Sequence, residues 1–216
     1  MHIKSVIFDL DGTLLNTYED LANAVNYGLK KYSYPTHDAE KYKIFTGNGT
    51  ETMIKRALPE AYRDNETYML IKEAYLEYYN THSGEYTRAY DGINELLQEL
   101  KKKGIKIAVT SNKIDCMTRQ VIDEYFPGCF DFVTGQYEGC HPKPNPDMVI
   151  KAMSNMSVTP QECLYVGDTG VDAMTGKQAG IFTIGVLWGF RDEQELIENG
   201  ADVVISQPLE LLNYIK

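Results

Sequence analysis

Strand-like and helix-like segments alternate along the C-terminal part of the sequence, and this alternation constrains the fold more than any other feature. From Asp91 onward, apolar runs of strand length are separated by segments whose apolar residues follow a helical period. The expected strands lie at 105–112, 130–135, 163–168, 181–186 and 202–205. This pattern predicts a parallel sheet with helices on its faces.

Capping residues indicate where several of the intervening helices begin and end. Asp91 suits the N-cap of the first helix, and Gly104 suits its C-terminal stop. The apolar residues of this helix are spaced at i, i+3, i+4 and i+7: Ile93, Leu96, Leu97 and Leu100. Asn145 followed by Pro146 indicates the N-cap and first turn of a helix that runs to about residue 156. Other helices are expected near 114–125, after residue 170, near 192–199 and at the C-terminus.

The N-terminal stretch VIFDLDGTLLNT begins as a buried strand, and a block without a convincing strand follows it. Helical patterns occur near 18–32, 50–58 and 65–80. In the third of these, one stripe holds Tyr68, Ile71, Tyr75 and Tyr79, which we interpret as packing residues. We therefore expect an α/β core of residues 1–16 and 84–216, interrupted by a compact helical domain of residues 17–83.

Polar residues follow several of the expected strands. Ligands of open parallel sheets bind outside the carboxyl ends of the strands, so these residues are candidates for a site. They are Asp9 and Asp11 after the first strand, Thr110, Ser111 and Asn112 at the end of the second, and Asp168 with Asp172 after a later one. Lys143, in the segment HPKPNPD, lies in a loop that could reach the same edge.

The chemistry of this edge favours phosphoryl transfer. Four carboxylates close together repel one another unless a cation lies among them, and oxygen ligands favour Mg²⁺. The ammonium of Lys143 and the hydroxyl of Ser111 could hold a phosphoryl group. Asp9 could attack phosphorus, while Asp11 protonates the leaving oxygen and later deprotonates water.

Each of these residues also has a simpler interpretation. Asp11-Gly12 alone is typical of a turn, and Lys143 between prolines could be a solvated charge. Ser111 could cap the following helix, and Asp172 could complement the dipole of its own helix. Their joint occurrence at the ends of successive strands favours a functional site.

Composition and charge limit the partners and the location. The formal charge of −10 disfavours non-specific nucleic-acid binding. The sequence shows neither a signal peptide nor an apolar run of membrane-spanning length, so we expect no membrane partner and a cytoplasmic location. Cys116, Cys129, Cys140 and Cys163 form no CxxC pair, and we assign them no function. The oligomeric state cannot be read from the sequence.

Four segments together resemble the motifs of the haloacid dehalogenase-like hydrolases. They are FDLDGTL, VTSN, KPNPD and GDTGVD, in the order of that family and over nearly the whole chain. The resemblance implies a Rossmann-like core with a helical cap inserted after the first strand, closing over a small substrate. Within this family, an aspartate at position 11 argues for phosphoryl transfer rather than for removal of a halide.

The resemblance also implies roles for individual residues. Asp9 would be the nucleophile, Asp11 the acid and base, and Ser111 and Lys143 would bind the phosphate, with Asn112 beside them. Mg²⁺ would be held by Asp9, Asp168 and the backbone carbonyl of Asp11, with Asp172 in support. The implied reaction is hydrolysis of a small phosphorylated metabolite through an aspartyl-phosphate.

The segment Thr46–Leu58 resembles the cap segment of phosphoglycolate phosphatases within this family. Gly47, Asn48 and Gly49 would then contact the substrate; the alternative is a plain turn followed by an N-cap at Thr50. A phosphomutase of the β-phosphoglucomutase kind, a pyrophosphatase and a phosphonatase stay open as activities. For a phosphonatase, the insertion offers Lys30, Lys31, Lys41, Lys43 and Lys55 as Schiff-base candidates. A non-catalytic binding module is disfavoured by the complete set of motif residues.

Overall fold

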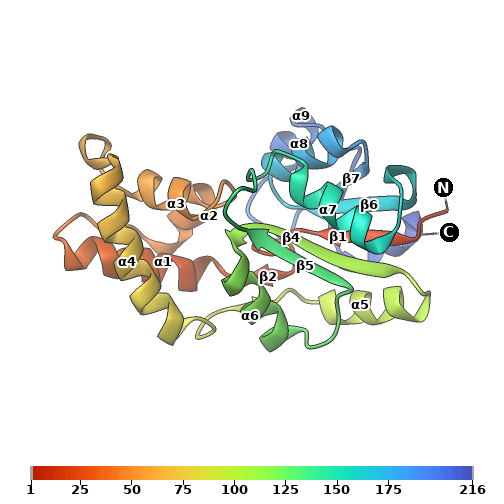
Figure 1. Ribbon diagram of the computed structural model, residues 1–216, viewed down its shortest axis with the longest axis horizontal. Helices are drawn as coiled ribbons and strands as arrows, with labels where there is room; N and C mark the ends of the chain where they lie inside the picture. The colour runs from red at the N-terminus through yellow and green to blue at the C-terminus, as the bar shows by residue number, and fades with distance from the viewer. Residues whose placement is uncertain (1, 216) are drawn as a thin grey trace. The chain divides into compact units, whose positions relative to one another are not determined.

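A computed structural model describes residues 2–215 and divides into two compact units (Figure 1). Unit 1 combines residues 1–15 with 89–216, and unit 2 is Asn16–Arg88. From the sequence, we expected the helical insertion to begin after residue 16 and to end before residue 84. The second unit therefore begins one residue earlier and extends five residues further than the helical insertion that we expected.

Unit 1 is built on a six-stranded parallel sheet. Its strands are β1 (Ser5–Phe8), β4 (Lys106–Ile114), β5 (Phe132–Gln136), β6 (Cys163–Gly167), β7 (Phe182–Val186) and β8 (Val203–Ile205). Their order in the sheet is β5-β4-β1-β6-β7-β8, and every neighbouring pair is parallel. The predicted α/β architecture is confirmed.

Helices cover both faces of this sheet (Figure 1), with α5 and α6 on one side and α7 and α8 on the other. The helices of unit 1 are α5 (Ile93–Lys102), α6 (Asp115–Tyr125), α7 (Asp147–Met156), α8 (Gly170–Ala179) and α9 (Glu193–Glu198), with 3₁₀ turns η3 (Pro160–Glu162) and η4 (Pro208–Tyr214). Along β1, Val6 and Phe8 join the apolar core of α5, whereas Ile7 joins the core of α7. A strand buried on both faces reads as a continuous apolar run, which explains the sequence VIF.

Two helix starts differ from the prediction. Asp91 is not the N-cap of α5: that position belongs to Gly92, whose φ of 85° turns the chain into the helix one residue later. A left-handed backbone at this point favours glycine over aspartate. The N-cap of α7 is Pro146, and the carboxamide of Asn145, one residue further out, accepts a hydrogen bond from the N–H of Asp147 at 2.9 Å. The expected C-terminal helix is η4, a 3₁₀ segment.

Unit 2 is helical, as the sequence predicts. It contains α1 (Tyr18–Lys31), α2 (Tyr42–Phe45), α3 (Thr50–Ala57) and α4 (Asn65–His82), with 3₁₀ turns η1 (Ala39–Lys41) and η2 (Glu60–Tyr62). At Gly28, an added Cβ would lie 3.1 Å from the side chain of Ile71, so the glycine lets α1 and α4 pack closely. The predicted stripe on α4 is buried in this unit, which confirms the packing interpretation.

The chain crosses between the units twice, through short strands. These are β2 (Leu15–Asn16) and β3 (Arg88–Ala89), which pair with each other as a separate two-stranded sheet. Within unit 2, the buried carboxylate of Asp20 near the start of α1 accepts hydrogen bonds from the backbone N–H groups of Gly84, Tyr86 and Thr87, and from the Thr87 hydroxyl. The outgoing and returning segments of unit 2 are thus tied together by one side chain.

None of the helices in residues 2–215 is both long enough and apolar enough to cross a bilayer.

Candidate active site

The candidate site lies at the carboxyl end of β1, where the strand order changes direction. From β1 the sheet continues through β4 and β5 on one side and through β6, β7 and β8 on the other. At such a switch point the loops diverge and leave a crevice. Asp9 follows β1 directly, and its N–H donates to the carbonyl of Val166 on β6 at 2.9 Å. The backbone of Asp9 is thereby fixed at the edge of the sheet.

Lys143 lies between two of the predicted carboxylates. Its ammonium donates to Asp9 Oδ1 at 2.6 Å and to Asp172 Oδ1 at 2.7 Å, and all three side chains are buried. Burial works to lower the pKa of Lys143, but Asp172 and Asp9 outweigh it and hold the pKa well above its usual value. Lys143 is therefore a buried cation of the cluster, and its interpretation as a solvated loop charge is wrong.

Asn112 fixes the loop that carries Lys143. Its side-chain amide donates to the carbonyl of Lys143 at 3.1 Å, and the N–H of Lys143 donates back to Asn112 Oδ1 at 2.7 Å. This reciprocal pair joins the end of β4 to a loop 31 residues further along the chain. Both side-chain polar atoms of Asn112 therefore form hydrogen bonds with the backbone of Lys143. Contact between Asn112 and a substrate stays a prediction.

Three side chains donate hydrogen bonds to the carboxylate of Asp172. Its Oδ2 accepts from the hydroxyl of Thr169 at 2.6 Å, within a capping box at the start of α8. Its Oδ1 accepts from Lys143 and, at 3.2 Å, from the buried hydroxyl of Tyr165. The simpler interpretation of Asp172 as an acid of the first helical turn is thus correct, and the ion pair with Lys143 adds to it.

Asp168 is buried between the loops that carry Gly12 and Gly189. It accepts from the hydroxyl of Thr13 at 3.0 Å and from the N–H of Phe190 at 2.8 Å. A Cβ at Gly12 or at Gly189 would overlap the Asp168 side chain, so both positions need glycine for the loops to approach this closely. Burial, and next the charge of Asp172, raise the pKa of Asp168 to about 7.

Three of these carboxylates could hold a metal ion. Asp9, Asp168 and Asp172 each offer an oxygen, all within 4.8 Å of one another, and all three side chains are buried. Burial raises the pKa of Asp9 well above its usual value, although Lys143 opposes the shift. One ammonium does not neutralise three carboxylates, and a purely oxygen donor set suits a hard cation. The residues present therefore fit Mg²⁺.

Asp11 has a partner that the sequence analysis missed. The ammonium of Lys113 donates to Asp11 Oδ1 at 2.9 Å and to Oδ2 at 3.1 Å. The predicted strand ended at Asn112, whereas β4 continues through Ile114 and carries Lys113 along the same edge. Ser111 Oγ, also buried, accepts from the N–H of Lys113 at 3.2 Å. Because the N-cap of α6 is Ile114, the alternative role of Ser111 as a helix cap is wrong.

The structure thus brings together in unit 1 the predicted loop residue Lys143 and the residues predicted from the strand ends: Asp9, Asp11, Ser111, Asn112, Asp168 and Asp172. Thr110, the remaining strand-end residue, is buried on β4 next to Ser111. Sequence reasoning missed Lys113, Thr13 and Tyr165. Thr13 stood inside the quoted first motif, and Tyr165 occupied an apolar strand position that gave no sign of its contact with Asp172.

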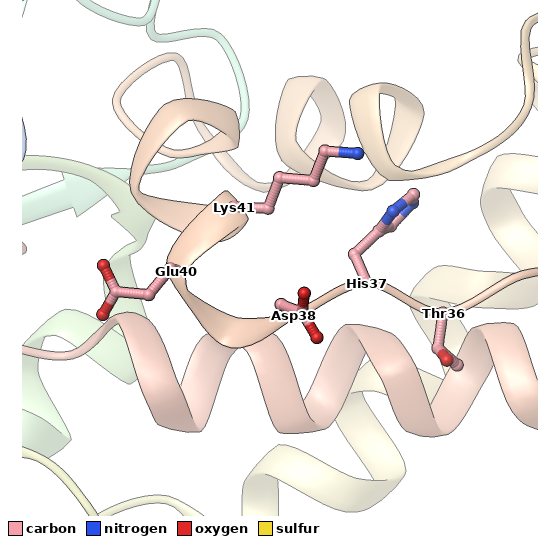
Figure 2. A pocket seen from close by; sticks show the side chains of 5 residues that line it. All are labelled: Thr36, His37, Asp38, Glu40 and Lys41. Carbon is pink, nitrogen blue, oxygen red and sulfur yellow. The ribbon is translucent and has the colours of Figure 1, made fainter.

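The predicted substrate residues of the insertion lie in unit 2, between α2 and α3. Gly47 and Gly49 have φ values of 111° and 89°, and Gly49, not Thr50, is the N-cap of α3. A substrate contact by Gly47, Asn48 or Gly49 stays a prediction. A separate hollow of about 530 Å³ in unit 2 is lined by Thr36, His37, Asp38, Glu40 and Lys41 (Figure 2). Its lining mixes both charges and does not include the glycine turn.

Comparison with known proteins supports one family. The family model of the haloacid dehalogenase-like hydrolases matches residues 6–186 of this chain. A phosphoglycolate phosphatase from Aquifex aeolicus is 31% identical over 97% of this chain and 95% of its own length. An N-acetylmuramic acid 6-phosphate phosphatase from Pseudomonas aeruginosa is 29% identical over 100% of this chain and 96% of its own.

Solved structures agree with these relatives. A protein from Lactobacillus delbrueckii subsp. bulgaricus, provisionally assigned as a phosphoglycolate phosphatase, superposes with a TM-score of 0.94 at 32% identity, covering 100% of this chain and 99% of its own. A predicted phosphatase from Clostridium acetobutylicum superposes with a TM-score of 0.88 at 26% identity, covering 99% and 98%.

Proposed function

We infer that this chain, which belongs to the haloacid dehalogenase-like hydrolases, is a magnesium-dependent phosphatase that hydrolyses small phosphate monoesters through an aspartyl-phosphate. The observation that carries this proposal is the buried cluster in which Lys143 bridges Asp9 and Asp172 beside Asp168. A phosphoryl group carries negative charge, and a water-poor site with a fixed ammonium suits its transfer.

The cation would be held by Asp9, Asp168 and the backbone carbonyl of Asp11, with Asp172 in support. When bound, Mg²⁺ would neutralise charge on the carboxylates and on the transferring phosphoryl group. Asp172 also orients Lys143, because the two side chains form an ion pair at 2.7 Å.

The first chemical step belongs to Asp9 and Asp11. A carboxylate oxygen of Asp9 attacks phosphorus, and the bond from phosphorus to the ester oxygen breaks. Asp11 gives its proton to the leaving oxygen, so the alcohol departs neutral. Lys143 and the Ser111 hydroxyl hold the phosphoryl oxygens during this transfer.

The second step restores the enzyme. A water molecule attacks the phosphorus of the aspartyl-phosphate, and the bond from phosphorus to the Asp9 oxygen breaks. Asp11, now a carboxylate, takes a proton from that water and is ready for another turnover. Phosphate then leaves the site.

The relatives indicate the kind of substrate. Phosphoglycolate and N-acetylmuramic acid 6-phosphate, which occur in the names of the relatives, are both phosphate monoesters of molecules that carry a carboxylate. We propose a substrate of that class for this chain, with phosphoglycolate as the first compound to test. The turn at Gly47, Asn48 and Gly49 is the proposed source of contacts to its carboxylate.

The test is a hydrolysis screen over phosphoglycolate, sugar phosphates, nucleotides, pyrophosphate and a phosphonate, with Mg²⁺ or with EDTA. We expect release of phosphate from monoesters in Mg²⁺ alone. Asp9→Asn should abolish turnover and the acid-stable phosphoprotein formed with radiolabelled substrate, while Asp123→Asn, at an exposed position on α6, should keep both.

Full activity in EDTA, or full activity of Asp9→Asn, would overturn this mechanism. Conversion of one sugar phosphate into its isomer without phosphate release would instead identify a phosphomutase.

A further inference from the structure

We propose that Lys113 is a positioning residue of the hydrolysis, which holds the Asp11 carboxylate where it transfers protons. The inference rests on the proposed function, because it assumes that Asp11 acts as acid and base. Lys113 lies outside the four motifs that led to the site, and it is distinct from Lys143, which serves Asp9 and Asp172.

The ion pair between Lys113 and Asp11 has a geometry that fixes the carboxylate. Lys113 donates to both oxygens of Asp11, at 2.9 and 3.1 Å, so the pair fixes the rotation of the carboxylate as well as its position. The side chain of Lys113 is 2% exposed and that of Asp11 is 12% exposed. Little water competes for this contact, whereas an exposed ion pair would be screened and mobile.

The backbone of Lys113 is itself fixed. Its carbonyl accepts from the Thr118 hydroxyl at 3.3 Å, in the first turns of α6. At Gly135 on β5, an added Cβ would overlap both that carbonyl and the Thr118 hydroxyl, so the two strands and the helix meet without spare room. The register between β4 and β5 shifts between Thr110 and Ile114, which is where Lys113 turns toward the site.

Lys113 also contacts Ser111, whose hydroxyl is proposed to bind the phosphate. The N–H of Lys113 donates to Ser111 Oγ at 3.2 Å, and a hydroxyl that accepts this bond still has its own proton to donate. Lys113 thus orients Ser111 with its backbone and Asp11 with its side chain. One residue sets the spacing between the phosphate-binding hydroxyl and the acid and base.

Proton transfer explains why this position matters. In the first step the proton of Asp11 goes to the ester oxygen, and in the second step a proton of water goes to Asp11. Both transfers need the carboxylate within hydrogen-bond reach of the reacting oxygen. If the carboxylate rotates away, the chemical steps become slower, while substrate binding by Lys143 stays intact.

The experiment compares Lys113→Met with Lys113→Arg on an alkyl phosphate and on p-nitrophenyl phosphate. For Lys113→Met we expect kcat on the alkyl ester to fall by about tenfold to a hundredfold, which reaches the lower end of general acid–base effects because Asp11 itself is still present, with a much smaller change in KM. Lys113→Arg should recover much of the loss, because a guanidinium can donate to both carboxylate oxygens.

A rapid-mixing measurement separates positioning from a loss of folded protein. Nitrophenolate leaves without help from an acid, so Lys113→Met should release one equivalent in a fast burst and then turn over slowly. A structural defect would lower the burst amplitude and the steady rate together, and would overturn the proposal. Lys106→Met is the matched control, since Lys106 lies at the other end of β4 and donates to the carbonyl of Met156.

The remaining outcomes are also decisive. An unchanged kcat in Lys113→Met, or no recovery in Lys113→Arg, would remove Lys113 from this role while the hydrolysis by the wild type stands. If the wild-type protein hydrolysed neither ester, the proposed function itself would fail, and Lys113 would have no reaction to serve.

Discussion

Asp168 illustrates how the position of a single side chain changes its acidity. The carboxyl group is buried between a hydroxyl of one loop and an amide of another, and its pKa rises to about 7. In the unfolded chain it would titrate near 3.8. Between these two values the folded protein keeps a proton that the unfolded chain gives up, so the free energy of unfolding falls as the pH rises through this window.

This difference predicts the pH dependence of the metal-free protein. In EDTA, the melting temperature of the wild type should fall between about pH 4 and pH 7, because burial and the charge of Asp172 disfavour the ionised form of Asp168. Asp168→Asn cannot ionise and should flatten this dependence, so its stability relative to wild type should rise with pH. Thermal melts at a series of pH values measure the effect.

An exposed carboxylate provides the control for this pH dependence. Asp123→Asn, at an exposed position of α6, should follow the wild-type curve. A constant difference between Asp168→Asn and wild type across the pH range would contradict the prediction. Saturating Mg²⁺ should stabilise the wild type most at the higher pH values, where the carboxylates are available to bind it.

Most of the site could be predicted from sequence, because strand ends in a parallel sheet converge whatever the details of packing. Asp9 and Asp168 follow from that rule, whereas Lys143 was only a loop residue that could reach the same edge. Lys113 does not, since its direction depends on a register shift in β4 that the run IKIAVTSN does not reveal. Tyr165 stays hidden for another reason: an aromatic residue in a buried strand is typical of packing, and its hydroxyl contact with Asp172 depends on where α8 begins.

At the scale of elements, the ends of two helices use the same backbone conformation with different residues. Gly180 follows α8 with φ 70°, and Ser157 follows α7 with φ 55°, both in the left-handed region. In each case the N–H of the cap residue donates to carbonyls of the last helical turn. Glycine adopts this conformation easily, whereas serine pays a steric cost.

The pair predicts opposite effects of exchange. Ser157→Gly should raise the free energy of unfolding by about 0.5–1 kcal/mol, and Gly180→Ser should lower it by about 1 kcal/mol. A Cβ added at Gly180 would have no atom of another segment within 4 Å, so we attribute the loss there to the backbone conformation. Urea unfolding curves measure both, and a loss of stability in Ser157→Gly would contradict the argument.

At the scale of the whole molecule, the chain divides into two compact units. The residues proposed for phosphoryl transfer are in unit 1, and those proposed for the rest of the substrate are in unit 2. Asp20 stabilises unit 2 from within, because its buried carboxylate satisfies three backbone N–H groups and one hydroxyl. Removing it would leave these donors without their acceptor.

Asp20→Ala should therefore loosen unit 2 in particular. The Thr87 donors are buried, whereas Gly84 and Tyr86 are accessible to water, so we expect a loss of about 1–3 kcal/mol, the cost of an unsatisfied buried donor. Hydrogen exchange should accelerate at Gly84, Tyr86 and Thr87, while the amides of β1 and β4 keep their protection. Asp64→Ala, which removes the N-cap of α4, is the matched control, with a loss of about 1 kcal/mol. Equal acceleration in both units would show that they unfold together.

The pairing of β2 with β3 brings the two ends of unit 2 side by side in the chain's path. For unit 1, everything between Asn16 and Arg88 is then equivalent to one long loop, and the entropy of closing a loop grows only slowly with its length. Under the proposed function, unit 2 contacts the substrate beyond its phosphate, so insertions, deletions or complete replacement of that loop would change which molecules are recognised without redesigning the sheet. A lineage with this arrangement would then acquire new substrates by exchanging one continuous stretch of sequence, while the proposed chemistry of unit 1 is inherited unchanged.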